Sequence, residues 1–256
     1  MINFFVSLLA KVMVPASLIF ICVFFGVSIS IIWLIELLRR DKLPEPMRMI
    51  FKIFFLGMVI TVPVFVIEFG ALKAIKWLNF SSFWTFLIYG FFAIALVEEV
   101  FKYLVVKISV LKSKEFDEPV DTMIYMATAA LGFAALENIL YLFPPIGQAL
   151  PFNELFINTV KISFFRFAGT TFLHALCSGL VGYFLALSIC RAKKKRSIMF
   201  LGLLIATLLH GLYNFSIIEI EDPLNLAIPI MILTGLAIFV TSGFRKLKKI
   251  KSVCRI

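Results

Sequence analysis

The sequence has little charge, because only 16% of its 256 residues are Asp, Glu, Lys or Arg. A soluble domain carries about 25% charged residues. Here the hydrophobic share is 62%, 30 residues are Phe and the mean hydropathy is +1.04. This composition excludes an ordinary soluble globular protein. It is typical of a polytopic membrane protein, with room for one helical membrane domain.

Cysteine is also scarce, and several familiar catalytic motifs are absent. The four cysteines, Cys22, Cys177, Cys190 and Cys254, form no CxxC pair. We therefore expect neither a disulfide framework nor a cysteine zinc site. The sequence contains no HExxH, the local signature of many zinc proteases, and no GxSxG, the nucleophile motif of many serine hydrolases. Any hydrolytic chemistry must use a different set of residues.

Seven apolar stretches are long enough to cross a bilayer, which takes about 20 helical residues. They cover residues 12–38, 50–72, 81–107, 122–143, 161–190, 198–218 and 224–244. We therefore predict an all-α bundle of about seven transmembrane helices in a bacterial-type plasma membrane. No separate soluble domain or internal repeat is visible, so residues 1–256 are expected to form a single integral-membrane domain.

Basic residues alternate between the connections of these stretches. The first, third and fifth connections and the tail 245–256 carry Lys and Arg, whereas the fourth and sixth carry none. The positive-inside rule therefore predicts an N-terminus outside and a C-terminus in the cytoplasm. The basic tail is expected to bind anionic lipid at the cytoplasmic face. Because most Lys and Arg flank apolar stretches, nucleic acid is not expected as a partner.

A few polar side chains lie inside the apolar stretches, where each charged group costs roughly 2.5–3.5 kcal/mol on insertion scales. Glu98 and Glu99 are adjacent in the third stretch, and Lys102 follows within reach of both on a helix. The later stretches add polar residues in the same way: Glu137, Arg166, Thr170, His174, His210 and Asn214. Ionisable groups inside a membrane indicate a functional site.

Each of these residues also has a structural explanation. Lone histidines and a Glu–Asn pair can hold a helix bundle together, and Ser178 with its neighbouring glycines predicts a small-residue packing face. Glu68, near the outer end of the second stretch, is expected at the membrane interface. The structural explanation must nevertheless treat acids and histidines on four successive stretches as separate coincidences. We therefore expect them to meet in one hydrated pocket, in the middle and outer half of the membrane.

The chemistry of such a pocket is hydrolysis. Two neighbouring carboxylates in a low-dielectric site cannot easily both be charged. An ionised glutamate can take a proton from water that attacks a peptide carbonyl, and the second can return a proton to the leaving amine. Either Glu98 or Glu99 can be the base at this stage. His210 and Asn214, one helical turn apart, are suited to donate hydrogen bonds to the oxyanion.

Two alternatives use the same residues. Zinc could be held by His174, His210, Glu99 and Glu137. The absence of HExxH favours metal-free glutamate chemistry, so no cofactor is expected. The buried acids could also serve a proton-coupled transporter or a non-catalytic membrane binder, although neither broken helices nor repeat symmetry is evident.

Four motifs follow one another along the chain. They are Glu98-Glu99-x-x-Lys102, Gly132-Phe133-x-x-x-Glu137-Asn138, His174-Ala175-Leu176 and His210-Gly211-x-Tyr213-Asn214. Their order and spacing, within about residues 44–244, resemble the PrsW family of intramembrane proteases. That family is related to the CAAX prenyl endopeptidases and the bacteriocin-processing enzymes. Glu137 stands where this wider clan has a histidine, and His174 is a candidate to replace that imidazole in space.

The resemblance implies a function and a set of essential residues. It implies that Glu98, Glu99 and His210 are indispensable, and that a single-span membrane protein is cleaved on its extracytoplasmic side. The typical target in that family is an anti-sigma factor, whose first cut starts the release of a sigma factor under envelope stress. The candidate catalytic residues are Glu98, Glu99, Lys102, Glu137, His174, His210 and Asn214.

Overall fold

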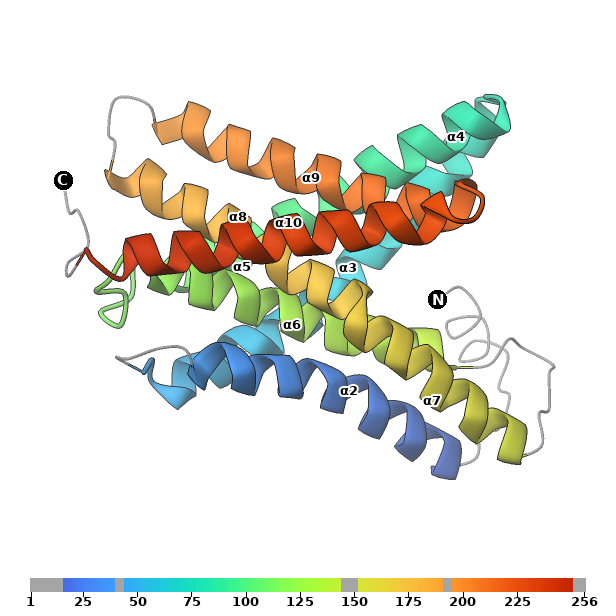
Figure 1. Ribbon diagram of the computed structural model, residues 1–256, viewed down its shortest axis with the longest axis horizontal. Helices are drawn as coiled ribbons and strands as arrows, with labels where there is room; N and C mark the ends of the chain where they lie inside the picture. The colour runs from blue at the N-terminus through green and yellow to red at the C-terminus, as the bar shows by residue number, and fades with distance from the viewer. Residues whose placement is uncertain (1–15, 40–43, 144–151, 191–194, 251–256) are drawn as a thin grey trace.

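The computed structural model describes residues 16–39, 44–143, 152–190 and 195–250, and all their regular structure is helical (Figure 1). The elements are α2 (Ala16–Arg39), α3 (Met47–Trp77), α4 (Ser82–Ile88), the π-helix η1 (Tyr89–Leu96), α5 (Val97–Ser109), α6 (Asp121–Leu142), α7 (Phe152–Ala168), α8 (Thr170–Cys190), α9 (Lys195–Glu219) and α10 (Leu224–Leu247). Within these residues seven helical stretches are long and apolar enough to cross a membrane. The predicted all-α, seven-span bundle is therefore confirmed.

Two of these stretches differ from their predicted form. The fifth was expected to start at residue 161, but α7 begins at Phe152 and continues through Gly169 into α8. Asn153 and Asn158 lower the hydropathy of the first turns of α7, which hid this part of the helix from the sequence pattern. The third stretch was expected as one helix but contains η1, eight residues of π-helix directly before α5.

Successive spans run in opposite directions, as Figure 1 shows. The C-terminal ends of α2, α5, α8 and α10 lie at the left end of the bundle, whereas α3, α6 and α9 end at the right. Helix ends next to the basic connections thus share one side of the molecule. Which side faces the cytoplasm stays a prediction. Residues 144–151 and 191–194 of the connections, and 251–256 of the basic tail, lie outside the described residues.

Helix α6 forms the centre of the bundle, and nearly all of its residues are buried. It packs against α2, α3 and α8. Its small residues allow this close approach: a Cβ added at Gly132 would meet the carbonyl oxygen of Phe54 in α3. On the facing helix, a Cβ at Gly57 would meet the carbonyl oxygen of Ala129. Small residues at such crossings are the usual means of tight helix packing in lipid.

The cysteines follow the expectation only in part. Cys22 and Cys177 are buried free thiols. Cys190 is disulfide-bonded, so the protein contains a disulfide although no disulfide framework was expected. It is the last residue of α8 and only half-buried, so the surrounding helices do not enclose its sulfur.

The glycine contact between α3 and α6 gives a stability prediction. Gly57→Ala places a methyl group against the Ala129 carbonyl, and overpacking of this kind costs about 1–3 kcal/mol. Gly70→Ala is the matched control, because it lies in the same helix and a Cβ there has no neighbour within 4 Å. We expect thermal unfolding in detergent to show a lower Tm for Gly57→Ala and an unchanged or slightly higher Tm for Gly70→Ala. Equal melting of the two variants would contradict the packing described here.

Candidate active site

Six of the seven candidate residues lie together inside the bundle. Their relative exposures are all between 0% and 5%. They come from four helices: Glu98, Glu99 and Lys102 from α5, Glu137 from α6, His174 from α8 and His210 from α9. A hydrated pocket was expected, but these side chains are almost completely shielded from solvent. A substrate can reach them only when helices move apart.

The ammonium group of Lys102 joins the two glutamates. Its Nζ donates to Oε2 of Glu98 at 3.0 Å and to Oε1 of Glu99 at 2.9 Å. A third contact, at 2.9 Å, reaches Nδ1 of His174. The ring of Phe133 lies next to the ammonium, 4.5 Å from Nζ to the ring centroid. Lys102 therefore uses all three of its N–H groups and contacts both carboxylates at once.

The partners of His174 define which ring nitrogen carries the proton. An ammonium only donates, so Nδ1 accepts from Lys102, and the proton is inferred to lie on Nε2. This Nε2 donates to Oε2 of Glu137 at 2.9 Å. Glu137 also accepts from Nη2 of Arg166 at 2.8 Å, and Nε of Arg166 donates to Asn138. Residues of α6 and α7 thus hold the imidazole in one orientation.

His210 is oriented by Glu99 in a similar way. Its Nδ1 lies 3.1 Å from Oε1 of Glu99, and an ionised carboxylate only accepts, so Nδ1 is inferred to carry the proton. The other oxygen of Glu99 accepts from Oγ of Ser178 at 3.1 Å. Lys102, His210 and Ser178 therefore fix Glu99 through both oxygens. Sequence reasoning assigned Ser178 to helix packing, although its spacing of four from His174 places both on one face of α8.

The two unprotonated ring nitrogens face one oxygen of Glu98. The distance to Oε2 is 3.6 Å from Nδ1 of His174 and 4.0 Å from Nε2 of His210. The imidazole rings are 5.0 Å apart and nearly perpendicular. Oε2 of Glu98 is thus the point on which the ammonium and both imidazoles converge.

This donor set fits a divalent metal ion. Glu98, Glu99, His174 and His210 each offer one ligand atom, and these four atoms lie within 4.8 Å of one another. Imidazoles and carboxylates are ligands that zinc accepts. Each imidazole also donates its N–H to a carboxylate, as zinc-binding histidines usually do. Because Lys102 bonds to three of the same side chains, an ion and the ammonium compete for their atoms.

Asn214 is the candidate residue that stands apart. It lies one turn beyond His210 on α9 and is half-buried. Neither the hydrogen bonds nor the ion pairs of the described residues connect its side chain to the cluster. Asn214 follows His210 by four residues and therefore lies on the same side of α9. The side chains of the cluster, however, form their hydrogen bonds and ion pairs with residues other than Asn214. Its expected role at the oxyanion stays a prediction.

Glu68 departs from the sequence expectation more strongly. It was expected at the membrane interface, but only 5% of it is exposed. It lies within electrostatic range of Glu98, Glu137 and Lys102. The interfacial expectation is wrong because η1 and α5 pack against α3, and Tyr89 of η1 lies within electrostatic range of Glu68. The predicted stretch ended at residue 72, whereas α3 continues to Trp77, so Glu68 lies nine residues before the end of the helix.

A seven-span bundle that buries paired glutamates and two histidines defines a membrane protein with a hydrolase-like intramembrane site. The model of a family described as PrsW family intramembrane metalloprotease matches residues 45–242. The chain belongs to this family. It is an integral membrane protein of the bacterial plasma membrane with intramembrane protease activity.

Curated relatives support this assignment over most of the chain. A protein named Protease PrsW from Bacillus subtilis is 33% identical over 210 residues, which cover 82% of this chain and 85% of the relative. Protease PrsW from Oceanobacillus iheyensis is 30% identical over 208 residues, which cover 81% of this chain and 88% of the relative. No solved structure matches the chain.

The central position of Lys102 gives a second prediction. Lys102→Met leaves Glu98 and Glu99 buried without their cation, and breaking a buried ion pair costs about 3–5 kcal/mol. Lys107→Met removes the same charge from an exposed position of the same helix, where a substitution changes stability by about 0.5 kcal/mol or less. We expect a much lower Tm in detergent for Lys102→Met than for Lys107→Met. Similar Tm values would mean that the ammonium does not stabilise the cluster.

Proposed function

We propose that this protease cleaves a single-span membrane protein near the extracytoplasmic face, with an anti-sigma factor as substrate. The family membership and the buried cluster support intramembrane cleavage, and the motif resemblance supports this substrate class. The alternation of basic connections supports the orientation, with the C-terminus in the cytoplasm. We also propose that the basic residues at the end of α10, such as Arg245 and Lys246, bind anionic lipid there.

Glu98 is proposed as the carboxylate that activates water. Glu99 has both oxygens engaged by three donors, whereas the hydrogen bond of Glu98 involves Oε2 alone. Oε1 of Glu98 is therefore available to accept a proton from water. This difference between two adjacent glutamates is the observation that carries the proposal, and it gives Glu99 the role of orienting His210.

The residues of the chain then provide a proton path. Glu98 accepts the proton as water adds to the peptide carbonyl carbon, and returns it to the leaving amine nitrogen as the C–N bond breaks. Lys102 is the nearest cation to this carboxylate and stabilises negative charge on the carbonyl oxygen. The inferred tautomer of His210 leaves no proton on Nε2, which makes it a ligand or an acceptor in this arrangement.

We further propose that Glu98, Glu99, His174 and His210 hold a divalent ion, zinc being the first choice by ligand type. Sequence reasoning favoured metal-free glutamate chemistry. The description of the family as metalloproteases and the converging donor atoms now favour the ion. When bound, such an ion supplies Lewis-acid activation of water and of the substrate carbonyl.

The different environments of the two glutamates predict that a change at Glu98 lowers the cleavage rate much more than a change at a hydrogen-bond donor to Glu99. The assay is cleavage of single-span anti-sigma factors by the purified protease in proteoliposomes. We expect Glu98→Gln to lower kcat/KM roughly a thousandfold, because the proton acceptor is lost. Ser178→Ala removes only one of the donors to Glu99, so we expect a loss of about tenfold or less. Glu154→Gln, at an exposed carboxylate of α7, serves as the control. Full cleavage by Glu98→Gln would end the proposal for Glu98.

The metal content of the purified protein distinguishes a metal-dependent mechanism from metal-free glutamate chemistry. We expect the purified protein to contain about one zinc ion per chain by elemental analysis, and His210→Ala to contain much less, since one ligand is lost. A chelator should remove the ion and the activity together, and added zinc should restore both. Full activity at less than about a tenth of an equivalent of any divalent metal would instead support metal-free glutamate chemistry.

A further inference from the structure

One carboxylate beside the candidate active site has no partner. Oε1 of Glu68 in α3 is buried without a hydrogen bond in the structure. The other three carboxylates each contact a cation: Lys102 contacts Glu98 and Glu99, and Arg166 contacts Glu137 at 2.8 Å. None of the ion pairs among the described residues includes Glu68. It is therefore the unpaired acid of this part of the bundle.

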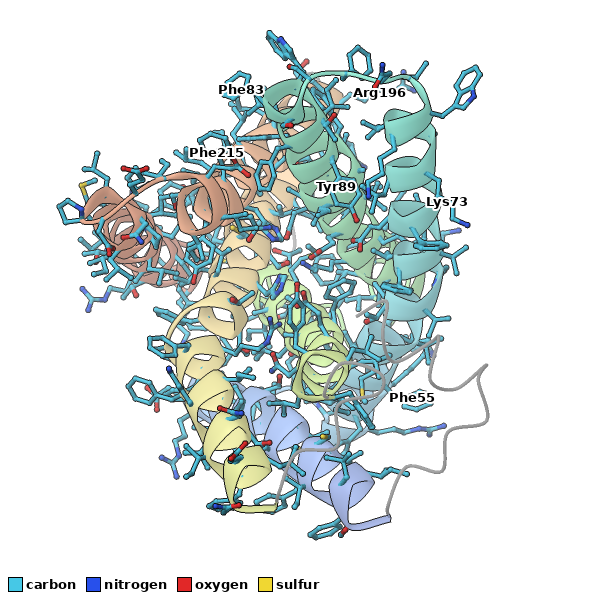
Figure 2. The ribbon with its side chains drawn as sticks, turned by 90° about the vertical axis from the view of Figure 1, so that its right-hand side faces the viewer. Phe55, Lys73, Phe83, Tyr89, Arg196 and Phe215 are labelled. Carbon is cyan, nitrogen blue, oxygen red and sulfur yellow. The ribbon has the colours of Figure 1, made fainter. Side chains whose placement is uncertain are left out.

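The basic residue next along α3 does not neutralise Glu68. Lys73 follows five residues later, and its Nζ lies 4.4 Å from the ring centroid of Phe69. Figure 2 shows Lys73 on the outer side of α3, pointing away from the other helices. The cation for Glu68 is thus not provided by its own helix.

A buried acceptor without a hydrogen bond is unfavourable, and its chemistry determines which donor can satisfy it. Leaving a buried acceptor unsatisfied costs roughly 1–3 kcal/mol, and more when the group is charged. An ionisable side chain inside a membrane is therefore a candidate for binding. A carboxylate is satisfied best by a cationic donor, which provides a charge-assisted hydrogen bond. In a protease, the molecule that brings new donors to this region is the substrate.

The position of Glu68 indicates which part of a substrate it meets. Thr61, two turns earlier in α3, has its hydroxyl 3.4 Å from the carbonyl of Phe133, the residue that packs on Lys102. Glu68 is therefore roughly 10 Å beyond the level of Phe133 and Thr61, toward the end of α3 at Trp77. This is the predicted extracytoplasmic side. About three residues of extended chain span such a distance.

The segment next to Glu68 is weakly packed. Tyr89, the first residue of η1, is within electrostatic range of both Glu68 and Glu98, and Figure 2 shows it on the side of η1 toward α3. Helix α4 has no buried residue. The buried residues of η1 are all small: Gly90, Ala93 and Ala95. Because little apolar area is buried here, moving α4 and η1 away from α3 costs less than separating the central helices.

We propose that Glu68 is a substrate-recognition residue that binds a lysine or arginine side chain of the substrate. That side chain lies about three residues from the cleaved bond, on the extracytoplasmic flank. The inference rests on the proposed protease function. A cationic side chain satisfies both the charge and the hydrogen bonding of the carboxylate, whereas a neutral backbone N–H satisfies only the second.

The test compares substrates that differ at one position. The probes are single-span peptides from a cleaved anti-sigma factor that carry Lys, Gln or Glu at the second, third or fourth extracytoplasmic residue from the bond. We expect the wild-type protease in proteoliposomes to show about tenfold higher kcat/KM for Lys than for Gln at one of these positions, mainly through KM. Glu68→Gln should bring this ratio to about one, and Glu68→Lys should reverse the preference toward Glu. Glu154→Gln, the same change at an exposed carboxylate, should keep the wild-type ratio.

The outcomes distinguish this inference from the protease function itself. A wild-type enzyme that cleaves Lys and Gln peptides equally, or a Glu68→Gln variant that keeps the wild-type ratio, overturns the role of Glu68 and leaves the protease function intact. If the wild-type enzyme cleaves no probe, the proposed function fails first. If Glu68→Gln does not fold, Glu68→Asp keeps the charge but shortens the side chain. That variant should lower the ratio at least threefold, and an unchanged ratio overturns the proposal.

Discussion

The structure depends on one constraint, that charges buried in a membrane protein need partners of opposite charge. Lys102 is the shared cation of Glu98 and Glu99, through contacts of 3.0 Å and 2.9 Å. Spacings of three and four on a helix make this possible within α5. The same ammonium also decides the tautomer of His174, because it can only donate to that ring. A single cation thus sets both the charge balance and the hydrogen-bond directions of the cluster.

The arrangement of helices follows from the need to bring polar groups from separate spans to this ammonium. Helix α6 is rich in Ala, so its neighbours approach closely, and its one glycine, Gly132, lies directly against the backbone of α3. The bulky groups of the cluster then fill the space between the helices, with Glu137 held by Arg166 from α7. The close backbone packing and the paired side chains together leave no room for water around the acids.

Most of the cluster could be predicted from sequence, because an acid or a histidine in an apolar stretch is costly and conspicuous. Glu98, Lys102 and His210 are predictable in this way. Ser178 is not, since a serine in a membrane helix costs little and is usually a packing residue. The burial of Glu68 is not predictable either, because counting residues from a helix end assumes that lipid or water surrounds the helix at that depth. The neighbours η1 and α5 pack against α3 instead. The π-helix η1 was not predictable from the sequence, because residues 89–96 are as apolar as the rest of the stretch.

The closed, ammonium-centred cluster has a consequence for how activity begins. Glu98, Glu99 and His174 direct their acceptor atoms at Lys102 in this arrangement, so the atoms that would hold a divalent ion are already bonded. The burial of these groups also excludes the water that hydrolysis consumes. Opening near α4 and η1 would admit water beside Glu98 and lower the cost of separating the ammonium from its carboxylates, because ion pairs weaken as the local dielectric rises. Admitting a substrate at this point would therefore also weaken the ion pairs that hold Glu98 and Glu99 to Lys102.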